Sequence, residues 1–189
     1  MTLRELLVQR RSELCERWVD ALLADYGRDT AELWRRERDP FANPVGHTIR
    51  AGASKLVEAL HCDGEPPAAA VDALGAIIKI RSIQALAPSR AVGFVYMLRD
   101  AVRDELAAEL AGGAYTAELA AVERRIERLA LIAFDIYVGC RDRIHRLRQD
   151  ELKRSVATLL RRWHGADELP APDSEVVQLA PPPSQAVRR

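Results

Sequence analysis

Apolar residues recur every three or four positions along most of the chain, and charged side chains fill the positions between them. This period is that of an amphipathic α-helix. It predicts helices over residues 2–25, 31–37, 44–60, 67–86 and 89–110. A last apolar stripe runs from Ala117 to Trp163 without a proline or a cap, so it predicts one helix longer than globular proteins usually contain, with a projecting or coiled-coil end. No stretch resembles a strand-rich domain, and the predicted fold class is all-α.

The most irregular stretch is RDPFANPVGHTIRAG, residues 38–52, which lies between two predicted helices. Asn43 is a good N-cap residue, and Pro44 suits the first helical position, where its missing N–H would have no partner in any case. Gly46 and Gly52 are poor helix formers. We expect their small size to allow close packing of another helix.

The pattern also divides the chain. Residues 1–147 form the predicted helical domain and residues 148–164 a helical extension. After Gly165 prolines appear without periodicity, so residues 165–189 are predicted to be a disordered Pro-rich tail.

Bulk composition limits the class of protein. The chain has 189 residues, 48% of them hydrophobic, and 28 basic side chains balance 28 acidic ones. Such a chain can bury one substantial core, and its zero net charge argues against a nucleic-acid partner. No apolar run is long enough to cross a bilayer, so no membrane insertion is expected. The three cysteines (Cys15, Cys62 and Cys140) are far apart and odd in number, which argues against a disulfide framework and suggests a reducing cytoplasm.

Few residues suggest chemistry. His47 is a weak candidate for a ligand or general base, because the nearby chain supplies no partner for it and a packed or capped histidine is more usual. His61, Cys62 and Asp63 are metal-competent, yet no second half of a zinc site follows, so no metal is expected. No catalytic or nucleotide-binding motif appears, and the protein is not expected to be an enzyme.

Asp135 lies in LALIAFDIYVGC, a run that is apolar nearly all round. If this carboxylate is buried it needs a hydrogen-bonding partner, so the pattern favours a structural network over a ligand contact. The Arg-rich stretch from Cys140 to Trp163 lacks interleaved aromatic residues, and a solvated or dimer-flanking face explains it better than nucleic-acid binding does.

Three blocks together resemble a known family: DPFANPVGHTIRAG, IIKIRSIQALAPSRAVGFVYMLRD and LALIAFDIYVGCRDRIHRLRQDELKR. They are similar to the RsbRD N-terminal domain family, the sensor modules of RsbR-type stressosome proteins, which are bacterial co-antagonists of the kinase RsbT. The resemblance covers about residues 3–163. It implies a globin-like helical fold, a homodimer, and in general no haem.

A globin-like arrangement would place residues 44–60 on the distal side of a haem and residues 67–86 on the proximal side. No His, Cys or Met occurs between Glu65 and Tyr96, so the usual axial iron ligand is missing and no cofactor is expected. Full stressosome proteins continue into a STAS domain that the kinase phosphorylates. Only about 25 residues follow the last helix, so output is expected to pass to a separate partner, such as a STAS-domain protein or an RsbT-like kinase.

The resemblance therefore implies a non-catalytic sensory or regulatory module of the cytoplasm. Two alternatives stay open, a scaffold or accessory protein of another bacterial complex and, with less support, a haem- or gas-binding globin-type sensor. The candidate ligand or structural motif comprises Asn43, Pro44, His47, Arg50 and Asp135. The candidate dimer interface comprises Leu7, Leu14, Trp18, Ile144, Leu147, Val156, Leu159 and Leu160.

Overall fold

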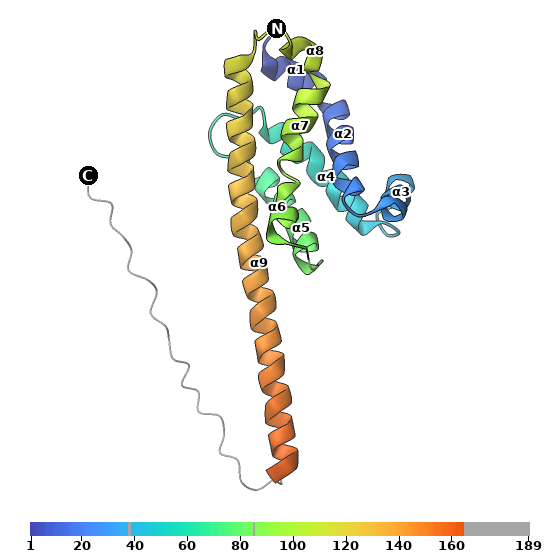
Figure 1. Ribbon diagram of the computed structural model, residues 1–189, viewed down its shortest axis with the longest axis vertical. Coiled ribbons are helices and arrows are strands. Elements are labelled where there is room, and N and C mark those ends of the chain that lie inside the picture. The colour runs from blue at the N-terminus through green and yellow to red at the C-terminus, as the bar shows by residue number, and fades with distance from the viewer. Residues whose placement is uncertain (38, 85, 165–189) are drawn as a thin grey trace, which may run out of the picture. The chain divides into compact units, whose positions relative to one another are not determined.

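The computed structural model describes residues 1–37, 39–84 and 86–164. Its elements are α1 (Leu3–Gln9), α2 (Arg11–Ala24), α3 (Arg28–Arg36), α4 (Pro44–Ala59), α5 (Ala68–Ile83), α6 (Pro88–Gly93), α7 (Met97–Glu105), α8 (Ala107–Leu110) and α9 (Thr116–His164) (Figure 1). The described residues contain no strand, which confirms the all-α prediction, and α9 confirms the single long C-terminal helix.

The chain divides into two compact units, residues 1–145 and residues 146–189. The helix α9 begins in the first unit and ends in the second. The predicted tail, residues 165–189, lies outside the described residues.

One hydrophobic core fills the first unit. The helix α4 packs against α5 and α2, and α2 packs against α7. The part of α9 in this unit contributes a stripe of buried side chains, which are Val122, Ile126, Leu129, Ala130, Ala133 and Tyr137. At the top of Figure 1 the start of α9 lies near α1, and there the Leu3 amide donates to the Glu118 carboxylate at 2.7 Å.

The helix predicted over residues 2–25 is broken at Arg10, which separates α1 from α2. Arg10 has φ −96° and ψ 19°, outside helical values. The apolar residues of both segments are buried in the same core, among them Leu3 and Leu7 before the break and Leu14 and Trp18 after it. The break changes the direction of the chain, so that the apolar faces of both α1 and α2 pack against the same core. A single straight helix would bury apolar side chains along one face only.

The helix predicted over residues 89–110 is also wrong as a single element, because α6 ends at Gly93 and α7 begins at Met97. Between them the amides of Val95, Tyr96 and Met97 donate to the carbonyl three residues back, the tighter 3₁₀ pattern. In this turn the Phe94 carbonyl accepts a hydrogen bond of 2.9 Å from the buried Trp18 indole N–H. The rings of Trp18 and Phe94 also pack together, with their centroids 5.8 Å apart. These two contacts hold α2 against the α6–α7 connection.

The two glycines of α4 have different reasons to be small. A Cβ on Gly52 would lie 2.9 Å from Ile77 Cδ1 of α5, which confirms close helix packing at this position. A Cβ on Gly46 would instead collide with the side chain of Asn43, the N-cap of the same helix. The packing prediction is therefore wrong for Gly46, whose size makes room for the cap.

Three residues predicted to form a dimer interface lie in the hydrophobic core of the chain itself. Leu7 and Trp18 are 0% exposed and Leu14 is 1% exposed, so their side chains have no surface to offer a second chain. Their apolar spacing reflects the core of the first unit. Ile144 is half-buried, and Leu147, Val156, Leu159 and Leu160 are exposed.

Candidate functional site: a pocket bounded by α2, α3 and α4

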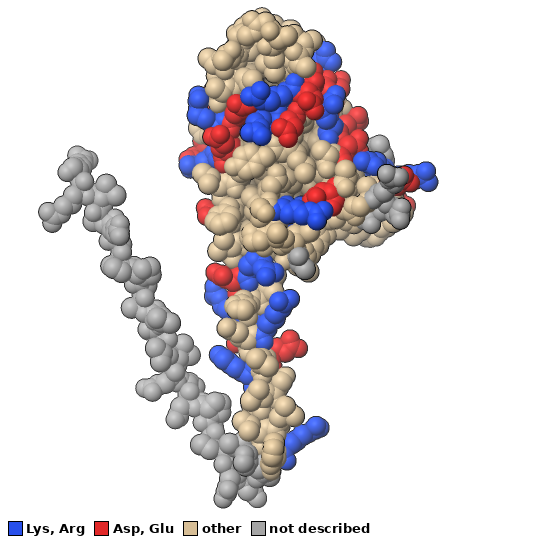
Figure 2. Space-filling model, in the orientation of Figure 1, with Lys and Arg blue, Asp and Glu red and all other residues tan. Residues whose placement is uncertain are grey.

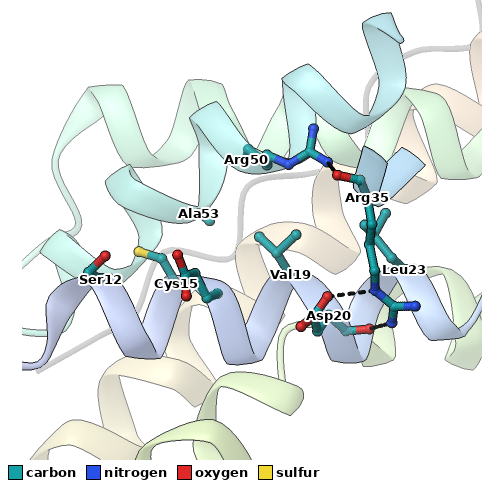
Figure 3. A pocket seen from close by; sticks show the side chains of 9 residues that line it. Ser12, Cys15, Val19, Asp20, Leu23, Arg35, Arg50 and Ala53 are labelled. Atoms are coloured by element: carbon teal, nitrogen blue, oxygen red, sulfur yellow. Dashed lines mark hydrogen bonds and ion pairs between the residues drawn. The ribbon is translucent and has the colours of Figure 1, made fainter. Parts of the chain in front are cut away.

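An open pocket of about 400 Å³ lies among α2, α3 and α4. Its apolar lining is formed by Cys15, Val19, Leu23 and Ala53, and its polar lining by Ser12, Glu16, Asp20, Arg35 and Arg50. Figure 3 shows Ser12 and Cys15 at one end of the pocket and the paired Asp20 and Arg35 at the other. A pocket with an apolar floor and a charged rim suits a small molecule that carries both kinds of group.

Asn43 fixes the start of α4 and the end of α3 together. Its Oδ1 accepts a hydrogen bond of 2.8 Å from the Gly46 amide, as an N-cap does. Its Nδ2 donates to the carbonyls of Trp34 and Glu37 at 3.0 and 2.9 Å. The last carbonyls of a helix have no partner within it, so this side chain, which is 3% exposed, satisfies those of α3.

Arg50, about two turns further along α4, reaches the same helix end. Its Nη2 donates to the carbonyls of Trp34 and Arg35. Arg35 in turn donates to the Asp20 carboxylate of α2 at 2.7 Å, and Figure 3 draws the contacts that Arg35 makes with Arg50 and Asp20. The stretch that looked irregular in sequence therefore holds α3 in place as one wall of the pocket.

The pocket does not hold a set of groups suited to nucleophilic catalysis. Burial raises the pKa of the Cys15 thiol, against the opposing charge of Arg11, so the thiol stays protonated at neutral pH. A protonated thiol is a poor nucleophile, and the described residues that line the pocket include no histidine that would activate it. The described lining offers apolar and charged contacts to a small ligand.

A second polar cluster lies in the first unit, where Asp25 follows the C-terminus of α2. Its carboxylate accepts hydrogen bonds from Arg81 Nη2 of α5 at 2.6 Å and from Arg90 Nε of α6 at 2.9 Å. The Arg81 side chain is fully buried and also donates to the carbonyls of Ala91 and Arg90 at 3.1 and 2.8 Å. One carboxylate thus joins three helices through two arginines.

Aromatic rings complete the surroundings of Arg81. Its guanidinium carbon lies 5.2 Å from the centre of the Tyr26 ring and 5.4 Å from that of Phe94, within cation–π range. Burial raises the pKa of the Asp25 carboxyl, but the hydrogen bonds and charges of Arg81 and Arg90 outweigh it, and the net pKa lies below its ordinary value. The ion pair is therefore formed at neutral pH.

His61 lies in a different place and belongs to neither cluster. It is 9% exposed, and its Nδ1 has no hydrogen-bond partner among the described residues. Burial lowers the pKa of His61, and the charges of Arg4 and Arg11 lower it further. In the described part of the chain no group of three or more His, Cys, Asp or Glu residues could hold a metal ion.

The structure brings together only two of the five residues predicted as a ligand or structural motif. Asn43 and Arg50 meet at the Trp34 carbonyl, whereas Pro44 and His47 are exposed at the start of α4. Asp135 is exposed on α9, so it needs no buried hydrogen-bonding network. The helix turns this residue away from the core that Ala133 and Tyr137 enter, although its neighbours in sequence are apolar.

The cluster of Asp25, Arg81 and Arg90 was missed by sequence reasoning. Arg81 lies in IIKIRSI, and its position in a strongly apolar run was the available signal. An arginine there must be either exposed or paired, but the sequence does not indicate that its partner lies 56 residues earlier.

Comparisons with known proteins bear on the first unit and the start of the second. A family model described as the RsbT co-antagonist protein rsbRD N-terminal domain matches residues 12–152, which is more than half of the chain. No curated protein and no solved structure matches. Among the described residues no helix has the length and apolar character needed to span a membrane.

Proposed function

Because the chain belongs to the family of the RsbT co-antagonist protein rsbRD N-terminal domain, we propose that it is a non-catalytic sensory or regulatory module that signals through protein–protein contacts. The family match over residues 12–152 is the observation that carries this proposal. The match includes the helices around the pocket and continues into α9. A small ligand in the pocket is one stimulus that such a module could receive.

The partners proposed for the module are a STAS-domain protein or an RsbT-like kinase in a bacterial cytoplasm. The test is to purify the tagged full-length protein from its native cells and to identify co-purifying proteins by mass spectrometry. Recovery of a STAS-domain protein or an RsbT-like kinase supports the proposal. Recovery of subunits of an unrelated complex, or of this chain alone, would favour a scaffold or accessory protein instead.

We also propose a homodimer, as the family resemblance implies, and place its contact on the first unit. Leu131, Phe134 and Val138 of α9 are 63%, 50% and 40% exposed. Leu131 and Phe134 line an apolar groove with Val92 and Tyr96 of the α6 region. Exposed apolar patches of this kind commonly mark protein interfaces.

The dimer can be tested by measuring the mass of the protein in solution. Leu131→Glu with Phe134→Glu should give a monomer, whereas Leu159→Glu with Leu160→Glu in the second unit should leave the mass unchanged. If only the second pair gives a monomer, the dimer contact lies in the second unit. If wild-type protein is a monomer at all concentrations tested, the homodimer proposal is wrong.

A further inference from the structure

The part of α9 that belongs to the second unit exposes a row of large apolar side chains. Leu152, Val156, Leu159, Leu160 and Trp163 are 65%, 46%, 63%, 43% and 86% exposed. Every residue from 146 to 163 is exposed. Exposed apolar rows of this length mark interaction surfaces in soluble proteins.

Four of these five residues have the spacing of a coiled-coil seam, and the fifth, Leu160, lies at a flanking e position. Leu152, Val156, Leu159 and Trp163 follow one another at intervals of four, three and four, the heptad spacing of core positions d, a, d and a. Leucine fills both d positions and the β-branched Val156 fills one of the two a positions, and these residue types favour pairs of helices. The seam therefore fits one partner helix.

The positions that flank this seam carry only one sign of charge. In this register Arg146 and Lys153 occupy e positions and Arg148 and Arg162 occupy g positions. The two acidic residues between 146 and 163, Asp150 and Glu151, fall at b and c, away from the seam. Figure 2 shows blue side chains and tan surface along this stretch of α9, with little red.

This charge pattern disfavours pairing with a second copy of the same segment. A parallel pair would place Arg148 of one chain against Lys153 of the other, and an antiparallel pair would again bring basic flanks together. Like charges at these positions oppose association, and opposite charges select the partner. The pattern therefore weakens the prediction that Val156, Leu159 and Leu160 form a homodimer seam.

We propose that residues 146–163 dock an amphipathic helix of a different protein, one that carries Glu or Asp at the positions flanking its apolar seam. The apolar side chains of the seam are buried against the partner helix, and the basic flanking residues select a partner with acidic residues at the facing positions. The inference goes beyond the proposed function, because it names the chemistry of a partner and does not require that partner to belong to a stressosome pathway.

The test uses full-length protein and two synthetic helical peptides with the same leucine and valine seam. One peptide has Glu at every e and g position and the other has Lys there. We expect the Glu peptide to bind about tenfold more tightly or better, a preference that should shrink as salt is added, because exposed charge pairs are screened. Equal binding of the two peptides, or binding of neither, would overturn the proposal.

Two variants with the same change in charge separate the flanks from general electrostatics. Arg148→Glu with Lys153→Glu leaves two acidic and two basic flanking residues, so this variant should lose the preference between the peptides. Arg154→Glu with Arg161→Glu alters f positions on the outer face of the helix and should keep the preference. If both variants lost the preference for the Glu peptide equally, the effect of charge would be non-specific and the proposal would be wrong.

The other occupants of the seam give distinct results. Leu152→Ser with Leu159→Ser should abolish binding of the Glu peptide without changing the mass of the protein in solution. A lower mass for this variant would identify a second copy as the occupant. Tighter binding of wild-type protein to vesicles rich in phosphatidylserine than to the Glu peptide would identify an anionic membrane surface instead.

Discussion

Asp25 shows how much one side chain can hold together in this protein. Its carboxylate lies between the fully buried guanidinium of Arg81 and the more exposed guanidinium of Arg90. A buried charge without a partner is far more costly than a surface one, because the surroundings cannot replace the water that it has lost. Arg81 can remain buried because its guanidinium pairs with Asp25, donates hydrogen bonds to two carbonyls and lies near the faces of two aromatic rings.

Asp25→Asn should therefore lower the free energy of unfolding at pH 7 by about 3 kcal/mol, the usual cost of breaking a buried ion pair. The pKa of Asp25 is lowered in the folded state, so its contribution is present above the unfolded pKa of about 3.9 and is lost as the pH falls through the folded pKa. Denaturant titrations at neutral and acidic pH should show the gap between wild type and variant closing only in strong acid. A gap that stays constant would mean that the carboxylate charge is not what stabilises the fold.

Asp20→Asn is the matched control, because Asp20 lies on α2, the helix that Asp25 follows, and pairs with an arginine at the surface. The side chains of Asp20 and Arg35 are 59% and 41% exposed. Exposed ion pairs contribute about 0–1 kcal/mol, so this variant should unfold almost as wild type does. If the two variants lost the same free energy of unfolding, the burial of Arg81 would not explain the destabilisation caused by Asp25→Asn.

Asn43 makes separable contributions as a cap and as a donor. Asn43→Ser keeps an oxygen for the Gly46 amide but loses the hydrogen bonds to the Trp34 and Glu37 carbonyls. Asn43→Ala loses all three, so it should be less stable than the serine variant by about 1 kcal/mol, the usual worth of an N-cap. Thermal unfolding followed by circular dichroism measures the difference, and equal stabilities would mean that the cap contributes nothing.

At the scale of elements, the sequence was informative where a local rule decides the structure. The Asn43–Pro44 start of α4 and the uninterrupted stripe of α9 follow from such rules, and both were predicted. The breaks at Arg10 and Phe94 carry no proline or glycine cluster that forces them. They exist because distant residues meet there, as Trp18 does at the Phe94 carbonyl, and such contacts are not visible in the spacing of apolar residues. The pocket could not be predicted for the same reason, because its shape depends on how α2, α3 and α4 are arranged in space.

Two glycines in helix interiors test the packing of elements directly. The methyl group that Gly139→Ala adds on α9 has no neighbouring atom within 4 Å. This variant should therefore raise the free energy of unfolding by about 0.5–1 kcal/mol through helix propensity alone. The same change at Gly52 places a methyl group 2.9 Å from Ile77 Cδ1 and forces that buried side chain to move. Gly52→Ala should gain nothing or lose stability in the same denaturant titration. An equal gain at both sites would show that α4 and α5 do not pack closely there.

At the scale of the whole molecule, the hydrophobic core and the exposed apolar row at the end of α9 lie in different stretches of the described chain. Each buried hydrophobic side chain of the described residues lies between Leu3 and Tyr137, within the first unit. Residues 146–163 expose apolar and basic side chains and contribute none to that core. This division suits a regulatory module whose folded unit stays intact while another surface is bound and released.

A chain that ends after His145 should therefore fold nearly as well as the full chain. We expect its thermal midpoint to stay within about 4 °C of the full-length value, the shift that about 1 kcal/mol produces in a chain of this size, while its binding to the Glu peptide is lost. A chain that ends after Glu127 also loses Leu129, Ala130, Ala133 and Tyr137 from the core, and it should melt at a much lower temperature without a sharp transition. Circular dichroism melts of the three chains measure these differences. A large loss of stability on removing residues 146–189 alone would show that the second unit supports the core, and stability and partner contact could then not be separated.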